Sequence, residues 1–353
     1  MDISNKKKNK EMKAIAKFYT YFWIIYFPVC IAFTYVVNFD YSDEVLTVLL
    51  LLYAMNHKNL MQRAQKRVDE IKIYILFMLC YLAYSFMVDI TTPRGIWLDF
   101  LQQIRPYAVF YLTWMMAPKF NDKQKKQIVA VMLLSFFGYL TAFMVKPELV
   151  SPYEGEESAA LGQIALCCGM IYLLFTEHSA KNKYIAIIIM LLGLASGKSK
   201  YIGECIAFIS LVLFVKDKIK LDSLATYLKV GALASVILFF TWTKFNVYYV
   251  EGFKEGAKNM ARPLTYTTGL QIMQDYFPFG SGLGTFACAA AAKEYSPLYK
   301  EYHLDNIWGL DKENPMFLAD TFYPIVYSEF GIIGVFFFLV FWKRRLNEAN
   351  TII

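Results

Sequence analysis

Long apolar runs recur along almost the whole chain, and they constrain its fold more than any other feature. They lie at residues 18–37, 43–55, 71–88, 97–117, 128–145, 158–176, 184–196, 201–215, 227–245 and 321–342. Only helices or closed barrels can cross lipid, because backbone polar groups find no water there. The runs are continuous and lack the alternation of barrel strands. We therefore predict an all-α fold: a polytopic membrane helical bundle of about ten transmembrane helices, forming one integral membrane domain over residues 1–353.

The basic residues indicate which way the bundle is oriented. Lys and Arg gather in alternate short loops and at both ends, which accounts for the net charge of +7 without a nucleic-acid partner. By the positive-inside rule, both termini are then cytoplasmic. The N-terminal lysines could open a signal peptide, but the next run reaches the spanning length of about 20 residues and has no small-residue cleavage site. We expect it to be a retained first helix.

A long polar segment, residues 246–320, then lies on the outer side between the last two transmembrane helices. It is too long for a simple connector. Tyr266, Leu270, Met273 and Phe277 share one helical face, which predicts a short interfacial helix. The stretch "PFGSGLGTF" predicts a tight turn, and "TFACAAAAKEY" a second short helix. No strand precedes the glycines, so they do not indicate a nucleotide-binding loop.

Two lysines interrupt the apolar stretch 187–214. If residues 184–215 formed one crossing, every later loop would have its charge on the wrong side, so we predict two short arms that meet at Lys198 and Lys200. The first arm has 13 residues and rises only about 20 Å, against a hydrocarbon core of about 30 Å. The lysines would lie below the outer surface and suit an anionic ligand. Alternatively they snorkel to the headgroups, or Lys200 pairs with Glu204.

Other ionisable residues are predicted on the same side. Arg105 would point into the outer half of the bundle, or serve a structural hydrogen-bond network near Gln102. Arg262 precedes the interfacial helix and Asp320 ends the loop. His303 is the only outer histidine, and ordinary solvation in the loop explains it better than a functional role. Three histidines and six scattered cysteines give no metal-binding spacing, so we expect no metal and no cofactor.

Three stretches resemble the O-antigen ligase and Wzy-type polysaccharide polymerase family. "ARPLTYTTGLQIMQDYFPFGSGLGTF" is similar to the outer-loop signature of that family, with an Arg, an amphipathic helix, a Pro and a Gly-rich turn. "ADTFYPIVYSEFGIIGVFFF" resembles its closing segment, with a Glu-x-Gly pair. "SGKSKYIGE" is similar to its Ser-Arg stretch, with Ser199 and Lys200 at that position. The resemblance covers roughly residues 158–342, and the order of the motifs makes it specific.

The resemblance implies an enzyme of the bacterial inner membrane that moves glycans carried on undecaprenyl pyrophosphate, at the periplasmic face and without a metal. The implied partners are this lipid-linked oligosaccharide, membrane lipids, a flippase and a chain-length regulator. Cations would bind the pyrophosphate, and Arg105, Lys198, Lys200 and Arg262 form the candidate set. Asp320 is the candidate catalytic base, with His303 second.

Two departures from the family pattern affect the function that we expect. Ligases carry a His-Asn pair nine residues before the Glu, where this chain has Asp320 and Thr321. This favours a polymerase over a ligase that transfers glycan to a lipid core. Lys200 replaces an Arg and loses its bidentate geometry. A transporter of lipid-linked oligosaccharides is the alternative from another class, but the internal repeats typical of transporters are not evident.

Overall fold

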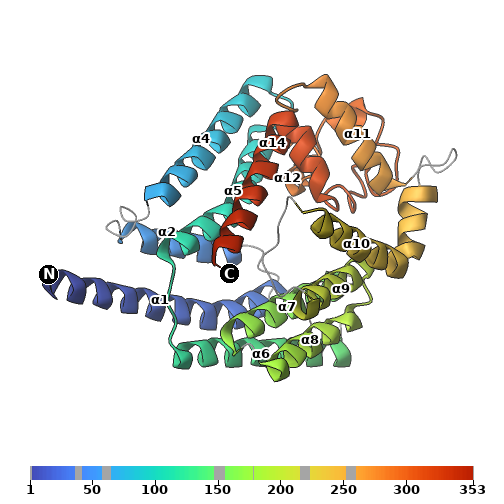
Figure 1. Cartoon of the computed structure of the whole chain (residues 1–353). Helices are drawn as coiled ribbons and strands as arrows, with labels where there is room; N and C mark the ends of the chain where they lie inside the picture. The colour runs from blue at the N-terminus through green and yellow to red at the C-terminus, as the bar shows by residue number, and fades with distance from the viewer. Residues whose placement is uncertain are drawn as a thin grey trace. The chain divides into compact units, whose positions relative to one another are not determined.

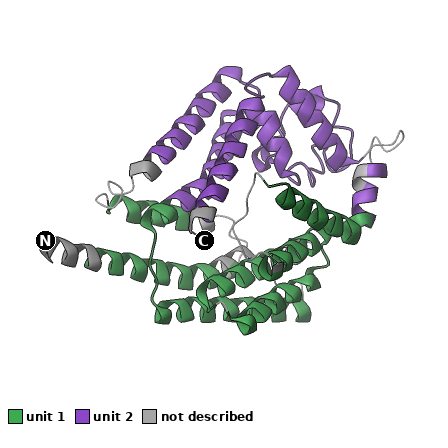
Figure 2. Ribbon diagram, in the orientation of Figure 1, with its two compact units in different colours: residues 1–63, 112–242 green, residues 64–111, 243–353 purple. Residues whose placement is uncertain are grey.

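The computed structural model describes residues 2–35, 42–57, 65–146, 156–177, 179–214, 223–251 and 260–352, and every regular element in these ranges is helical (Figure 1). The chain divides into two compact units (Figure 2). Unit 1 comprises Met1–Arg63 and Leu112–Trp242, and unit 2 comprises Ala64–Tyr111 and Thr243–Ile353. Both units are therefore assembled from distant parts of the sequence.

Unit 1 is built around two neighbouring helices, α6 (Asp122–Val145) and α7 (Glu156–Phe175). α1 (Asp2–Tyr35) packs along α6 and also contacts α2 (Ser42–Met55). The buried side chains between the helices are large and apolar, and include Met132, Phe136, Leu161, Met190 and Tyr201. In lipid the hydrophobic effect does not drive helices together, so close packing of this kind stabilises their association.

The start of α6 follows directly from its sequence. The side chain of Asn121 accepts a hydrogen bond from the backbone N–H of Gln124, and the side chain of Gln124 accepts one from the backbone N–H of Asn121. This capping box satisfies two of the backbone donors that every helix leaves open at its N-terminus. The polar residues 122–127 form the first turns of α6, and the apolar run begins at Ile128.

The predicted two-arm arrangement of residues 184–215 is present in unit 1. α8 (Ala180–Leu192) continues into a short 3-10 helix, η2 (Gly193–Ser196), and the helix ends at Gly197, which has a φ of 64°. α9 (Ser199–Phe214) then packs back against α8. The hydroxyl of Tyr201 donates a hydrogen bond of 2.6 Å to the carbonyl oxygen of Met190, which fastens the two arms together.

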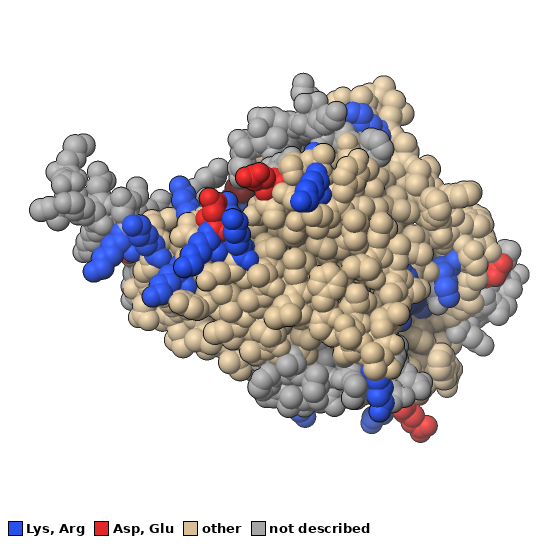
Figure 3. Space-filling model, turned by 90° about the horizontal axis from the view of Figure 1, so that it is seen from below, with Lys and Arg blue, Asp and Glu red and all other residues tan. Residues whose placement is uncertain are grey.

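Several helices are long and apolar enough to cross a membrane, as expected of a helical membrane protein. Within the described residues they are Asp69–Val88, Asp122–Val145, Leu224–Phe245 and Phe322–Ala349, the last of which is broken at Gly331. Shorter apolar helices lie at Glu44–Met55 and Ala160–Phe175. α10 (Leu224–Phe245) has no buried residue, although its mean hydropathy is 1.7. Figure 3 shows one face on which residues other than Lys, Arg, Asp and Glu cover a wide area. An exposed apolar helix such as α10 is stable in lipid rather than in water.

Unit 2 contains most of the segment that was predicted as the outer loop. Its helices are α4 (Gln65–Val88), most of α5 (Pro93–Met116), α11 (Ala261–Asp275), α12 (Ala289–Glu294), α13 (Leu298–Glu301) and α14 (Phe322–Ile352). One core lies among α11, α12 and the turns that follow, around Phe286 and Tyr299. A second core joins α4 and α5 to α14 through Met78, Ile96 and Phe330. The segment 260–320 is therefore a packed structure, not a loose connector.

The last helix is broken, which the sequence analysis did not predict. Gly331 has φ 60° and ψ −160°, far from helical values. The rings of Phe322 and Phe338 lie 6.0 Å apart, whereas 16 residues of straight helix would separate them by about 24 Å. α14 therefore consists of two arms that meet at Gly331. A side chain at this position would collide with the carbonyl oxygen of Pro278, so the close approach requires glycine.

Candidate functional site

Two predicted site residues meet at the beginning of α11 and just before α14. Arg262 lies in the first turn of α11, and Asp320 lies two residues before Phe322. The Nε–H of Arg262 donates a hydrogen bond to Oδ2 of Asp320, 58 residues away, in an ion pair of 2.5 Å. The side chains are 37% and 30% exposed, so both are accessible to a ligand. The contact joins a strong anion-binding group to a carboxylate that can accept a proton.

The packing of α11 against α14 fixes this pair in place. The hydroxyl of Tyr327 donates a hydrogen bond to the carbonyl oxygen of Tyr266, and Gly269 lets the Tyr327 ring approach closely. Thr265, Thr268 and Ile272 face the interior of unit 2. Leu270 and Phe277 remain exposed, although Phe277 lies beyond the last residue of α11. Tyr266 and Met273, the other two members of the predicted interfacial face, are half-buried, so Leu270 alone is exposed on that face of α11.

The Gly-rich turn after α11 packs against the break in α14. The backbone N–H groups of Ser281 and Gly282 donate to the carbonyl oxygens of Ser328 and Glu329, and the hydroxyl of Tyr81 donates to that of Phe330. Three consecutive carbonyls that lose their helical partners at Gly331 are thus satisfied by other groups. The Glu-x-Gly pair in the sequence therefore has a structural explanation.

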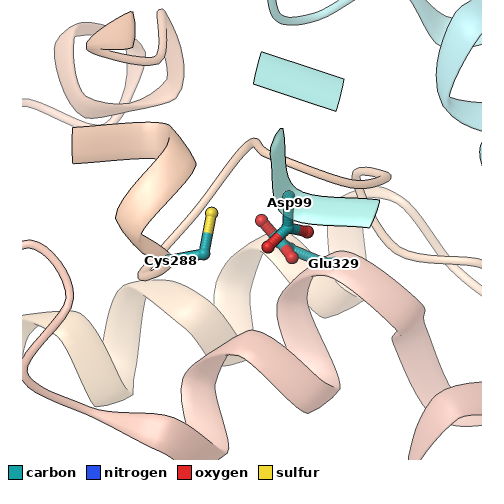
Figure 4. A group of neighbouring side chains, drawn as sticks. All are labelled: Asp99, Cys288 and Glu329. Atoms are coloured by element: carbon teal, nitrogen blue, oxygen red, sulfur yellow. The ribbon is translucent and has the colours of Figure 1, made fainter. Parts of the chain in front are cut away.

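A buried polar cluster lies beside this turn (Figure 4). Oε1 of Glu329 accepts hydrogen bonds from the backbone N–H groups of Thr285 and Phe286. Asp99 of α5 accepts from the N–H of Gly284 and from the side-chain amide of Gln103. The two carboxylates point toward each other, and both residues have no exposed surface. The donor atoms of Asp99, Glu329 and Cys288 all lie within 4.8 Å of one another.

Sequence reasoning missed Asp99 and did not assign Glu329 to a site. The signal was present in both cases, because each is an acidic residue inside an apolar segment, where such residues are rare and usually functional. Arg105, which was singled out instead, is half-buried on α5, six residues from Asp99. Gln102 was expected to lie beside Arg105. The next residue, Gln103, donates the hydrogen bond from its side-chain amide to Asp99.

The predicted lysines lie in unit 1, at the tip between α8 and α9. Lys198 is exposed, and the side chain of Lys200 is 81% exposed. Nζ of Lys200 lies 3.9 Å from Glu204, which also accepts hydrogen bonds from the side-chain amide of Gln163. One alternative given for Lys200, a pair with Glu204 one turn later, is therefore seen in the structure. The partial screening of such an exposed pair makes it weak.

His303, the second candidate base, lies in the turn after α13. It is exposed and has a φ of 58°. In the described part of the chain, no hydrogen bond or ion pair joins it to Asp320. Of the six predicted site residues, the structure thus brings Arg262 and Asp320 together.

The fold and these sites define a helical membrane protein with a paired cation and carboxylate near its last helix. No protein-family model matches the chain, and neither a curated protein nor a solved structure matches it.

Proposed function

We propose that this chain is a polysaccharide polymerase of the bacterial inner membrane. It transfers a growing glycan from undecaprenyl pyrophosphate to a sugar hydroxyl of the next lipid-linked repeat unit. In this proposal the chain crosses the membrane about ten times, both termini are cytoplasmic, and residues 246–320 face the periplasm. The observation that carries it is the Arg262–Asp320 ion pair, which couples a diphosphate-binding group to a proton acceptor.

The chemistry requires both groups. The acceptor hydroxyl oxygen bonds to the anomeric carbon, while the bond from that carbon to the pyrophosphate oxygen breaks. The pyrophosphate leaves with the electron pair, and an Arg guanidinium stabilises the developing charge through paired hydrogen bonds. The proton of the acceptor hydroxyl passes to a carboxylate within hydrogen-bonding distance. Arg262 supplies the first function and Asp320 the second.

The existing contact between these two residues suggests an order of events. Without substrate, Arg262 and Asp320 neutralise each other. A pyrophosphate carries more charge than one carboxylate and competes for the guanidinium. Binding of the donor then loosens the Arg262 contact and leaves Asp320 available to take the acceptor proton. The base is thus activated only when a leaving group is in place.

A cavity in unit 2 offers room for part of the lipid chain of such a substrate. It encloses about 470 Å³ between α4, α5 and α14 and is lined mainly by aromatic side chains. Phe322, two residues from Asp320, lies in its wall with Tyr74, Phe77, Tyr107 and Phe337. Its volume lies within the range of about 300–1,000 Å³ typical of ligand sites. An isoprenoid chain in this cavity would hold its pyrophosphate near α14.

Lys198, Lys200 and Arg105 are proposed as further cations for the substrate, and His303 as the alternative base. No metal or other cofactor is required for the transfer. A flippase would deliver the repeat units and a chain-length regulator would act on the product, so both are proposed partners.

Two other functions compete with this one. A ligase of the same chemistry would transfer finished glycan to a lipid core, using the same cation and base. A transporter would move the lipid-linked oligosaccharide without breaking a bond. The internal repeats typical of transporters are not evident in the sequence, which favours transfer chemistry over transport.

The decisive experiment uses purified protein in liposomes with an undecaprenyl-pyrophosphate repeat unit. We expect a ladder of products that differ by one repeat unit. Transfer to an added core lipid without a ladder would indicate the ligase. Protection of the oligosaccharide inside the vesicle, with its length unchanged, would indicate the transporter.

A further inference from the structure

The cluster of Asp99, Glu329 and Cys288 contains two buried carboxylates whose negative charge is not neutralised by a neighbouring basic side chain of the described residues. Both carboxylates are fully buried, and Cys288 is 2% exposed. In the described residues, neither carboxylate forms an ion pair with Lys, Arg or His. Two adjacent carboxylates in a low-dielectric interior repel each other strongly when both are ionised. Either a proton shared between the two carboxyl groups or a bound cation must relieve that repulsion.

The hydrogen bonds leave one side of the cluster unsatisfied. Oε1 of Glu329 accepts two backbone N–H groups, and both oxygens of Asp99 accept hydrogen bonds. Oε2 of Glu329 is buried without a hydrogen-bond partner. An unsatisfied buried polar atom is rare in folded proteins and indicates a missing ligand, water or ion. This oxygen is part of the carboxylate that points toward Asp99 (Figure 4).

We propose that Asp99, Glu329 and Cys288 bind a divalent transition-metal ion, for which Zn²⁺ is the best match. Carboxylate oxygen and cysteine sulfur are both ligands of Zn²⁺, at about 2.0–2.3 Å. The three donor atoms lie within 4.8 Å of one another, so small side-chain rotations place them around a single ion. The positive ion neutralises the carboxylates and gives Oε2 of Glu329 a partner.

The position of the cluster makes the ion structural. It joins α5, the segment 284–288 and the first arm of α14, three parts of unit 2 that are distant in the sequence. Structural zinc sites normally have four ligands; this cluster supplies three, so a buried water must supply the fourth. The site is independent of the proposed glycan transfer.

The test measures metal in untagged protein purified from zinc-replete cells. We expect about one zinc per chain and a fall of about tenfold or more in the Asp99→Asn and Cys288→Ala variants. Cys168→Ala is the matched control, because Cys168 is equally buried but lies in unit 1. Its zinc content should equal that of the wild type. One equivalent of another divalent metal, lost in the same two variants, would also support the site.

A second measurement uses only the wild-type protein, in case the variants do not fold. A strong chelator should lower its melting temperature, and added Zn²⁺ should restore it. Wild-type protein without bound metal and with no response to the chelator would overturn the proposal, and a proton would then relieve the carboxylate repulsion. Equal zinc in the wild type and both cluster variants would overturn it as well.

Discussion

The hydroxyl of Tyr81 donates a 2.7 Å hydrogen bond to the backbone carbonyl of Phe330, 249 residues further along the chain. This bond satisfies one of the carbonyls that the break at Gly331 releases, in a setting where water is excluded. Tyr81→Phe should therefore lower the free energy of unfolding by about 1–3 kcal/mol, the usual cost of leaving a buried acceptor without a donor. Thermal unfolding of the purified protein measures the effect. Tyr323→Phe is the control, because Tyr323 is exposed and should tolerate the change.

Gly331→Ala should destabilise unit 2 more than any ordinary surface substitution. Gly331 has a positive φ, and an added methyl group would meet the backbone of Pro278 and Gly280. We expect a cost of about 2 kcal/mol or more, because both the strain and the steric overlap must be relieved. Gly231→Ala in α10 offers the comparison, since nothing lies within 4 Å of its added Cβ. A melting temperature unchanged in Gly331→Ala would mean that the break is not required.

Arg262→Ala and Asp320→Asn should each abolish the glycan ladder while the protein stays folded and in the membrane. Arg262→Lys should retain little activity, because an ammonium group lacks the paired donors of a guanidinium. The control is Arg94→Ala, which removes an exposed Arg paired to Glu294 in the same unit. Its product lengths should match those of the wild type. Normal long-chain product from Arg262→Ala would exclude Arg262 from the site.

Lys200→Gln separates a substrate-binding role from the local pair with Glu204. If Lys200 binds pyrophosphate, the variant should need a substrate concentration about tenfold higher for the same rate, equivalent to about 1.4 kcal/mol. Lys200→Arg should restore binding, since the charge is kept. If Lys200 only pairs with Glu204, all three proteins should have the same KM, because exposed pairs contribute little.

Labelling can determine the orientation of the tip between α8 and α9. Lys198→Cys should react with a membrane-impermeant maleimide in intact spheroplasts, above the background of the native cysteines. Lys343→Cys, near the C-terminus, should react only after permeabilisation. The opposite pattern would reverse the proposed topology and remove the tip from a periplasmic site.

The sequence predicted much of the helical architecture because apolar runs report directly on burial in lipid or protein. The break between α8 and α9 could be predicted as well, since charge placement demanded it. The break at Gly331 could not be predicted, because glycine is common inside the apolar runs of transmembrane helices and seldom breaks them. Its effect depends on the turn 279–282, some 50 residues earlier. Asp99 could have been noticed as an acidic residue inside an apolar run, but its partners at Gly284 and Glu329 come from other segments and could not be predicted from that run.

The candidate site shows the same limit. Arg262 and Asp320 could be named from local motifs, and each lies beside a helix start that the sequence predicts. Their direct contact depends on how α11 packs against α14, which local periodicity does not report. Lys200 was predicted to bind an anionic ligand, but the partner that the structure gives it is Glu204, on its own helix.

The bend at Gly331 has a consequence for the surrounding lipid. Below it, the uncharged apolar stretch 332–342 rises only about 16 Å as a helix before Lys343, Arg344 and Arg345 begin. A hydrophobic stretch this short thins the bilayer around it or draws headgroups inward. The membrane beside this arm of α14 should therefore be thinner, which would shorten the distance between the headgroups and the arm.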